Sequence, residues 1–182
     1  MKRALFALLA VVAVAVLWTV PRGMASSAAA YPLEVGLRWS YGPVERRIDR
    51  TVEVDGLRYY EMTYALPLLG TRTLLMRHAA AGVVTTGDVL LLRLPMVEGD
   101  AWTVDVPGEK EVADCRVLGE EEIAFAGRTG RAVKLEVRRR SRDGRALATD
   151  YEWYAPGVGL VKMDVTMGIR ATFTLASFQR MY

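Results

Sequence analysis

The chain has 182 residues, of which 52% are hydrophobic and 25% charged, so it can bury a core and is neither a disordered polymer nor a polytopic membrane protein. Its formal charge of +3 comes from the N-terminal segment: without residues 1–30, 21 Lys and Arg residues face 21 Asp and Glu residues, which argues against nucleic-acid binding. One cysteine and one histidine exclude disulfide frameworks and multi-Cys or multi-His metal sites.

The N-terminus has the pattern of a secretory signal peptide over residues 1–30. Two basic residues precede an uncharged apolar run at 4–20. Ala28 and Ala30 are the small side chains that a signal peptidase accepts, so we expect cleavage after Ala30 and a single antiparallel β domain over 31–182. The apolar run is at the lower limit of about 17–25 residues for a membrane helix, which disfavours an uncleaved anchor. Membrane contact is therefore expected only through this segment, before cleavage.

The rest of the chain is a succession of predicted strands. Turns at Asp55-Gly56 and at 141–144 are typical of hairpins, because Asp and Gly tolerate left-handed backbone. No run of ten or more residues has helical spacing with a cap, and the strands leave no room for crossover helices, which predicts an antiparallel meander. Alternation or apolar runs indicate strands, in chain order, at 52–54, 57–64, 72–78, 82–86, 89–94, 101–106, 112–118, 133–138, 151–154, 160–166 and 170–178.

A meander of this length is expected to curl or close, because broad twisted sheets rarely stay open and exposed edges promote aggregation. A barrel, a half-barrel or a sandwich would satisfy this requirement. Apolar residues on both faces of some strands, as at 74–76 and 89–92, favour a curved sheet over a flat one. The predicted fold class is therefore all-β, a curved antiparallel meander sheet that forms a half-barrel or barrel.

An internal repeat suggests that two diverged half-units build this sheet. The frame P-x-x-x-G-x-x-W occurs at 32–39 and again 63 residues later at 95–102. Proline fixes an extended entry, glycine permits a tight turn, and tryptophan opens the next strand with a large apolar side chain. We therefore expect Trp39 and Trp102 to lie near strand starts and to be buried.

Two segments carry a resemblance to a known group of proteins. The opening YPLEVGLRWSY at 31–41 and the closing WYAPGVGLVK at 153–162 resemble motifs of a widespread group of uncharacterised bacterial secreted or lipoprotein domains. The resemblance implies an antiparallel half-barrel, similar to bacterial lipoprotein carriers, in a bacterial protein that is periplasmic or secreted. This chain departs from many members because it has no cysteine for lipid attachment near the predicted cleavage site.

The residues whose side chains could act in catalysis or bind an ion are expected to have structural roles. His78 lies in no catalytic motif, and Cys115, on a predicted strand, is expected to be a small buried hydrophobe. Glu120, Glu121 and Glu122 are expected in a solvated turn, without the oxygen spacing of a calcium site. The basic hairpin at 138–140, with Arg142 and Arg145, could meet anionic head groups or polysaccharide, but a hydrated hairpin tip is the simpler interpretation. The sequence thus predicts a non-enzymatic domain without cofactor or metal.

Aromatic residues offer the sharpest functional hypothesis. Tyr60, Met62 and Tyr64 share one face of a predicted strand, and Tyr151 and Trp153 share one face of another. A curved sheet could bring both groups to its concave side, where they either fill the core or line a groove for an apolar ligand. These five residues are the candidate ligand-binding site. The predicted function is an extracytoplasmic binding or carrier domain for an apolar or lipid-like ligand; the alternative is a structural or assembly protein of the cell envelope.

Overall fold

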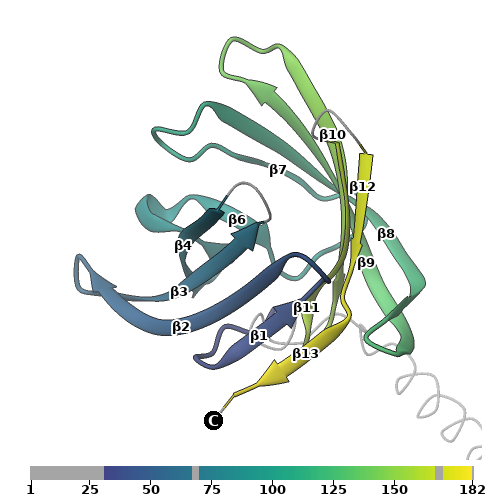
Figure 1. Ribbon diagram of the computed structural model, residues 1–182. Coiled ribbons are helices and arrows are strands. Elements are labelled where there is room, and N and C mark those ends of the chain that lie inside the picture. Colours follow the sequence, from purple (N-terminus) through teal and green to yellow (C-terminus); the bar gives the residue numbers. More distant parts are fainter. Residues whose placement is uncertain (1–30, 67–69, 167–169, 182) are drawn as a thin grey trace, which may run out of the picture.

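A computed structural model of the chain describes residues 31–66, 70–166 and 170–181, so the predicted signal segment lies outside the described residues (Figure 1). None of the described residues forms a helix long and apolar enough to span a membrane. These residues form a short 3-10 turn (Thr86–Asp88) and strands β1 (Leu37–Ser40), β2 (Glu45–Val54), β3 (Leu57–Leu66), β4 (Gly70–Ala79), β5 (Gly82–Val84), β6 (Leu90–Arg93), β7 (Ala101–Val104), β8 (Glu111–Phe125), β9 (Arg128–Ser141), β10 (Ala146–Ala155), β11 (Gly159–Thr166), β12 (Arg170–Thr174) and β13 (Ser177–Arg180).

The strands form two antiparallel sheets. The N-terminal sheet has the order β13-β1-β2-β3-β4-β5-β6, and the C-terminal sheet has the order β12-β11-β10-β9-β8-β7. The N-terminal sheet curls, and the long strands β8 to β10 of the other sheet extend past it (Figure 1). The prediction of an all-β, curved antiparallel meander is confirmed, with the meander divided between two sheets.

The division follows the sequence repeat. Strands β1 to β6 are neighbours in chain order in one sheet, and β7 to β12 are neighbours in chain order in the other. Trp39 lies in β1 and is 2% exposed, and Trp102 lies in β7 and is 8% exposed. Both tryptophans are therefore buried, as predicted; Trp102 is the second residue of β7, whereas Trp39 is the third of the four residues of β1. Strand β13 then returns to pair with β1, which ties the second half to the first.

The glycines of the two repeat frames have the same backbone role. Gly36 and Gly99 have φ values of 91° and 89°, in the region that favours glycine. The Gly36 N–H donates to the Ile48 carbonyl at 2.9 Å, and the Gly99 N–H donates to the Val117 carbonyl at 3.0 Å. In both cases the accepting residue immediately precedes a β-bulge, in β2 and in β8 respectively. The two half-units thus share this glycine conformation and this hydrogen bond as well as a sequence frame.

The predicted acidic turn and the last predicted strand differ in the structure. Glu120, Glu121 and Glu122 lie inside β8, which continues to Phe125, and not in a turn. The strand continues because the bulge after Val117 lets it stay paired with β9 while bending. The predicted strand at 170–178 is two strands, β12 and β13, one in each sheet.

The two sheets are joined by a buried core and by hydrogen bonds from aromatic side chains. In β1, the Trp39 indole N–H donates to the Val158 carbonyl at 2.6 Å. After β1, the Tyr41 hydroxyl donates to the Leu160 carbonyl at 2.7 Å. Both donors are buried and both acceptors belong to the second half of the chain, so these bonds fix how the two sheets dock.

Candidate functional site

The three candidate residues of β3 lie on the core face of the N-terminal sheet. Met62 is fully buried, in register with Ile48 of β2 and Leu74 of β4. Tyr60 and Tyr64 lie on the same face and pack against the core while staying partly exposed. Met62 therefore fills the core, and the two tyrosines border it.

The two candidates of β10 lie on a different surface. Glu152 is in register with Leu135 and Met163, which are core residues. Because adjacent residues of a strand point to opposite faces, Tyr151 and Trp153 lie on the other face of the C-terminal sheet. The structure therefore does not bring the two aromatic groups together, contrary to the expectation from the sequence. Whether any of the five binds a ligand stays a prediction.

Trp153 is covered by charged side chains. The ammonium nitrogen of Lys162 lies 4.1 Å from the ring centroid and that of Lys134 lies 4.9 Å from it. The indole N–H donates to the carboxylate of Glu121. Lysine stems cover apolar surface while their charges stay in water, and a cation over an indole face is favourable. The ring is 2% exposed, so this group stabilises the sheet.

Tyr64 belongs instead to a polar group between the sheets. Arg46 of β2 is in register with Tyr64, and its guanidinium lies 4.8 Å from the Tyr64 ring centroid and 5.7 Å from that of Tyr41. Its Nη2 atom reaches Met163 of the facing sheet, 4.0 Å from the sulfur. The Tyr31 and Tyr154 rings pack together at 6.0 Å. We call this group the Arg46 cluster: Tyr31, Tyr41, Arg46, Tyr64, Glu152 and Tyr154.

The Arg46 cluster combines a positive charge with neutral phenols. Burial raises the pKa of Tyr41 to about 12, partly opposed by Arg46. Burial likewise raises the pKa values of Tyr31, Tyr64 and Tyr154. Burial acts to lower the pKa of Arg46, but the neighbouring tyrosines, Tyr41 first, raise it above its usual value. At neutral pH the guanidinium is thus charged and the phenols keep their protons.

The alternation of apolar residues around Arg46 is a sequence signal that this side chain points inward. Val44 and Ile48 are 2% and 1% exposed, and Arg46 lies midway between them in the alternation. An arginine at a position whose neighbours two residues away are core residues must itself point toward the core. A charged residue at such a position is a stronger functional indicator than a stripe of aromatic residues, because aromatic residues are ordinary core material.

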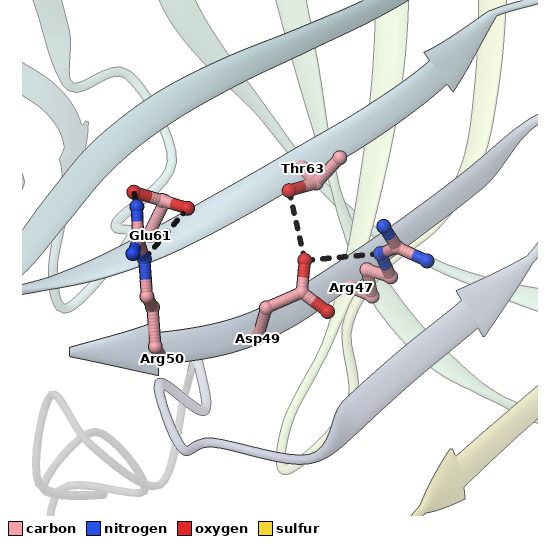
Figure 2. Close-up of polar contacts among 5 residues, drawn as sticks. All are labelled: Arg47, Asp49, Arg50, Glu61 and Thr63. Carbon is pink, nitrogen blue, oxygen red and sulfur yellow. Dashed lines mark hydrogen bonds and ion pairs between the residues drawn. The ribbon is translucent and has the colours of Figure 1, made fainter.

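A second polar group lies at the bulge of β2 (Figure 2). It lies on the face of the N-terminal sheet that is opposite to the core face. The Asp49 carboxylate accepts hydrogen bonds from the Thr63 hydroxyl at 2.9 Å and from the Arg47 guanidinium at 3.0 Å. Arg50 and Glu61 form a two-point ion pair with distances of 3.1 and 2.9 Å. Every one of these charged groups has a partner, so the group holds the bulge in place.

Neither of two surface clefts that are lined by described residues includes a candidate residue. One, of about 370 Å³, lies at the β9–β10 hairpin and includes Arg139, Arg140 and Leu147 in its lining. The other, of about 130 Å³, lies beside the β1–β2 pair, between Val35 and Met181. The aromatic residues of the sequence hypothesis therefore lie away from both clefts.

The surroundings of the single histidine and of the single cysteine indicate structural roles for both residues. Burial lowers the pKa of His78, which keeps its ring neutral at neutral pH. Cys115 is 5% exposed, and burial raises the pKa of its thiol to about 12, so it is a buried hydrophobe as predicted. Within the described ranges, no three His, Cys, Asp or Glu side chains are placed to hold a metal ion.

The charged runs are paired within the chain. Lys134 and Arg131 of β9 pair with Glu121 and Glu120 of β8. Four arginines of the basic hairpin also have carboxylate partners: Arg138 with Glu136 at 2.9 Å, Arg139 with Asp150 at 2.8 Å, Arg140 with Asp114 at 2.8 Å, and Arg142 with Asp105 at 2.7 Å. The hydrogen bond from Arg140 holds the pKa of Asp114 below its usual value. Internal pairing leaves little unbalanced charge on this hairpin for an anionic partner.

No protein-family model and no curated protein sequence matches the chain. Among solved structures it is similar to a "putative exported protein with YmcC-like fold" from Bacteroides fragilis, with 14% identity over 82% of this chain and 98% of that chain and a TM-score of 0.48. It is also similar to a "putative lipoprotein" from Parabacteroides distasonis, with 15% identity over 82% and 97% of the two chains and a TM-score of 0.44. These similarities are too distant to support an argument about ligand or mechanism, and the family resemblance of the opening and closing motifs stays a prediction.

Proposed function

We propose that the protein is a non-enzymatic domain that works outside the cytoplasm and binds an apolar, lipid-like ligand between its two sheets. The observation that carries the proposal is a set of apolar side chains on the facing surfaces that border the core without being fully buried. Tyr60 and Leu74 belong to this set in the N-terminal sheet, and Val137 and Val165 belong to it in the C-terminal sheet. Apolar surface of this kind suits a ligand of variable shape, such as an acyl chain.

A matched pair of leucines in β4 tests the binding surface. Leu74 is in register with Met62 on the core face, whereas Leu75 is in register with Glu61 on the opposite face, and both leucines are half-buried. We expect the parent protein to take up dansyl-labelled undecanoic acid, and Leu74→Gln to weaken uptake about tenfold by placing an amide against the acyl chain. Leu75→Gln should retain it. Absence of uptake by the parent protein, or an equal loss in both variants, would contradict the proposal.

Location outside the cytoplasm is supported by the pattern of residues 1–30. The expected mature protein begins at Tyr31, after Ala28 and Ala30. Intact-mass spectrometry of the exported protein checks this expectation. A product that retains Met1 in the membrane fraction would count against it.

An exposed apolar pair favours envelope assembly as a second candidate. Val35 and Met181 are 44% and 54% exposed and line the same small cleft, where the Met181 N–H donates to the Gly36 carbonyl at 2.8 Å. Exposed apolar residues grouped in this way are typical of protein contacts. A photoreactive amino acid at position 181 should then cross-link the protein to an envelope protein in cells. Absence of any cross-link would remove this candidate.

A further inference from the structure

Arg46 differs from Arg139, a partly buried arginine on the facing surface of the other sheet, in having no anionic partner. In the facing sheet, Arg139 lies 2.8 Å from the Asp150 carboxylate and 3.4 Å from that of Glu111. No carboxylate of the described residues lies within 4.0 Å of the Arg46 guanidinium, and its buried Nε atom has no hydrogen-bond partner among them. A charge in such a position is costly unless it is paired, so the missing partner calls for an explanation.

The surroundings of Arg46 hold the guanidinium in place without neutralising it. The ring faces of Tyr41 and Tyr64 contribute quadrupole attraction, which orients a cation but leaves its N–H donors free. The sulfur of Met163 is a weak acceptor at 4.0 Å. The side chain as a whole is only partly buried, although its Nε atom is buried, so part of it is accessible to a group from solution.

Glu152 is the carboxylate of this cluster that could compete for Arg46. Its Oε2 atom instead accepts a hydrogen bond from the Tyr154 hydroxyl at 2.5 Å, on the same strand. Tyr154 packs on Tyr31, which limits its movement. The arrangement therefore keeps the one nearby carboxylate engaged elsewhere and leaves the guanidinium available.

We propose that Arg46 is the subsite for the oxyanion head group, a carboxylate or a phosphate, of an amphiphilic ligand. This inference rests on the proposed binding of an apolar ligand between the sheets and adds its polar end. The planar guanidinium is always charged and presents paired donors that match the two oxygens of a carboxylate or phosphate. The acyl chain then extends over Leu74 and Tyr60, on the face of the N-terminal sheet to which Arg46 also belongs.

The inference is tested with ligands that have the same alkyl chain and differ in the head group. Isothermal titration of the full mature protein would compare dodecanoate and dodecyl phosphate, each below its micellar concentration, and dodecanol below its solubility limit. Acetate and inorganic phosphate would serve as free anions. We expect the two anionic amphiphiles to bind about tenfold to a hundredfold more tightly than dodecanol, the range for hydrogen bonds to a charged group. The free anions should show no measurable binding.

Arg46→Gln should remove the preference for the anionic amphiphiles while leaving dodecanol binding unchanged. Arg47→Gln is the matched control, because it removes the same charge one residue away on the opposite, exposed face. Glu152→Gln should leave the preference in place or increase it. If Arg46→Gln fails to fold, equal affinity of the parent protein for dodecanoate and dodecanol would still overturn the proposal.

The outcomes separate the two proposals. Equal binding of dodecanol and dodecanoate by the parent protein would overturn the role of Arg46 and leave the apolar site standing. Binding of neither would overturn the proposed function. If phosphate or acetate alone binds as tightly as the amphiphiles, and this binding is lost in Arg46→Gln, Arg46 is a site for free anions. That result would overturn the assignment of an amphiphilic ligand.

Discussion

Truncating Trp153 tests the assignment of this residue to a structural role. Its ring is 2% exposed and is held between the ammonium groups of Lys134 and Lys162. Trp153→Ala removes the whole ring from a site that the surrounding strands cannot close without breaking their pairing. Such truncations cost about 3–5 kcal/mol of unfolding free energy. The hydrogen bond to Glu121 adds little to this cost, because that exposed carboxylate regains water.

The expected loss is large but leaves a folded protein. A domain of this size is stable by about 7–20 kcal/mol. At about 2–4 °C per kcal/mol, the melting temperature should fall by roughly 6–20 °C. Tyr151 provides the internal comparison, because it lies on the same face of the same strand but is partly exposed. Tyr151→Ala should therefore cost clearly less, about 1–2 kcal/mol.

Equilibrium unfolding in urea, followed by far-UV circular dichroism, measures both variants without relying on the fluorescence of the mutated residue. Linear extrapolation gives the free energy in water, and an unchanged slope shows that the unfolded states are comparable. A loss below about 1 kcal/mol for Trp153→Ala at unchanged slope would mean that the ring is not packed. The ring would then be available to a ligand, and the structural role argued from its burial would be wrong.

Three further predictions concern the docking of the sheets, the repeat frame and the single histidine. Tyr41→Phe should cost about 1–3 kcal/mol in urea unfolding, because it leaves a buried carbonyl of the facing sheet without its donor; a change near zero would mean that water replaces the hydroxyl. Gly99→Ala should cost about 1–2 kcal/mol from backbone strain alone, whereas Gly36→Ala should cost more, since its Cβ would also clash with a main-chain oxygen beside β13; equal losses would refute this difference. Burial lowers the folded-state pKa of His78, so protonation favours the unfolded chain: stability should be complete above about pH 6.5 and fall as the pH drops through the folded pKa. Urea midpoints between pH 5 and 8 should show this decline, and His78→Gln should flatten it.

Much of the fold could be predicted from local features of the sequence. The Asp55-Gly56 turn lies between β2 and β3, with φ values of 52° and 74°, because these residues tolerate the backbone that a two-residue hairpin requires. Repetition of the P-x-x-x-G-x-x-W frame predicted the two half-units and the burial of both tryptophans. These features depend on a few neighbouring residues, so they are visible in one sequence.

The candidate site could be predicted only in part, because alternation states which residues share a face and not which face is covered. For β3 the inner face was predicted, since Met62 is buried and lies between two tyrosines that border the core. For β10 the inner face holds Glu152, whose carboxylate is engaged by Tyr154. Tyr151 and Trp153 point outward, whereas Glu152 points inward beside Tyr154, which reverses the usual preference at three successive positions. No local sequence pattern indicates this reversal.

The bulges explain why the outward aromatic residues are nevertheless buried. Before its bulge, β8 places Val117 in register with Leu135 on the core face; after it, Glu120 is in register with Val133 on that same face. One extra residue therefore moves the inward positions from odd to even numbers, and Glu121 falls on the outer face, where it accepts the indole N–H of Trp153. The Val117 carbonyl that precedes this change is held by the N–H of the repeat-frame glycine. In both half-units the frame is thus hydrogen-bonded to a residue beside a bulge, and after the bulge the inward-pointing positions change between odd and even numbers. The alternation must therefore be counted anew after each bulge when side chains are assigned to the inner or outer face.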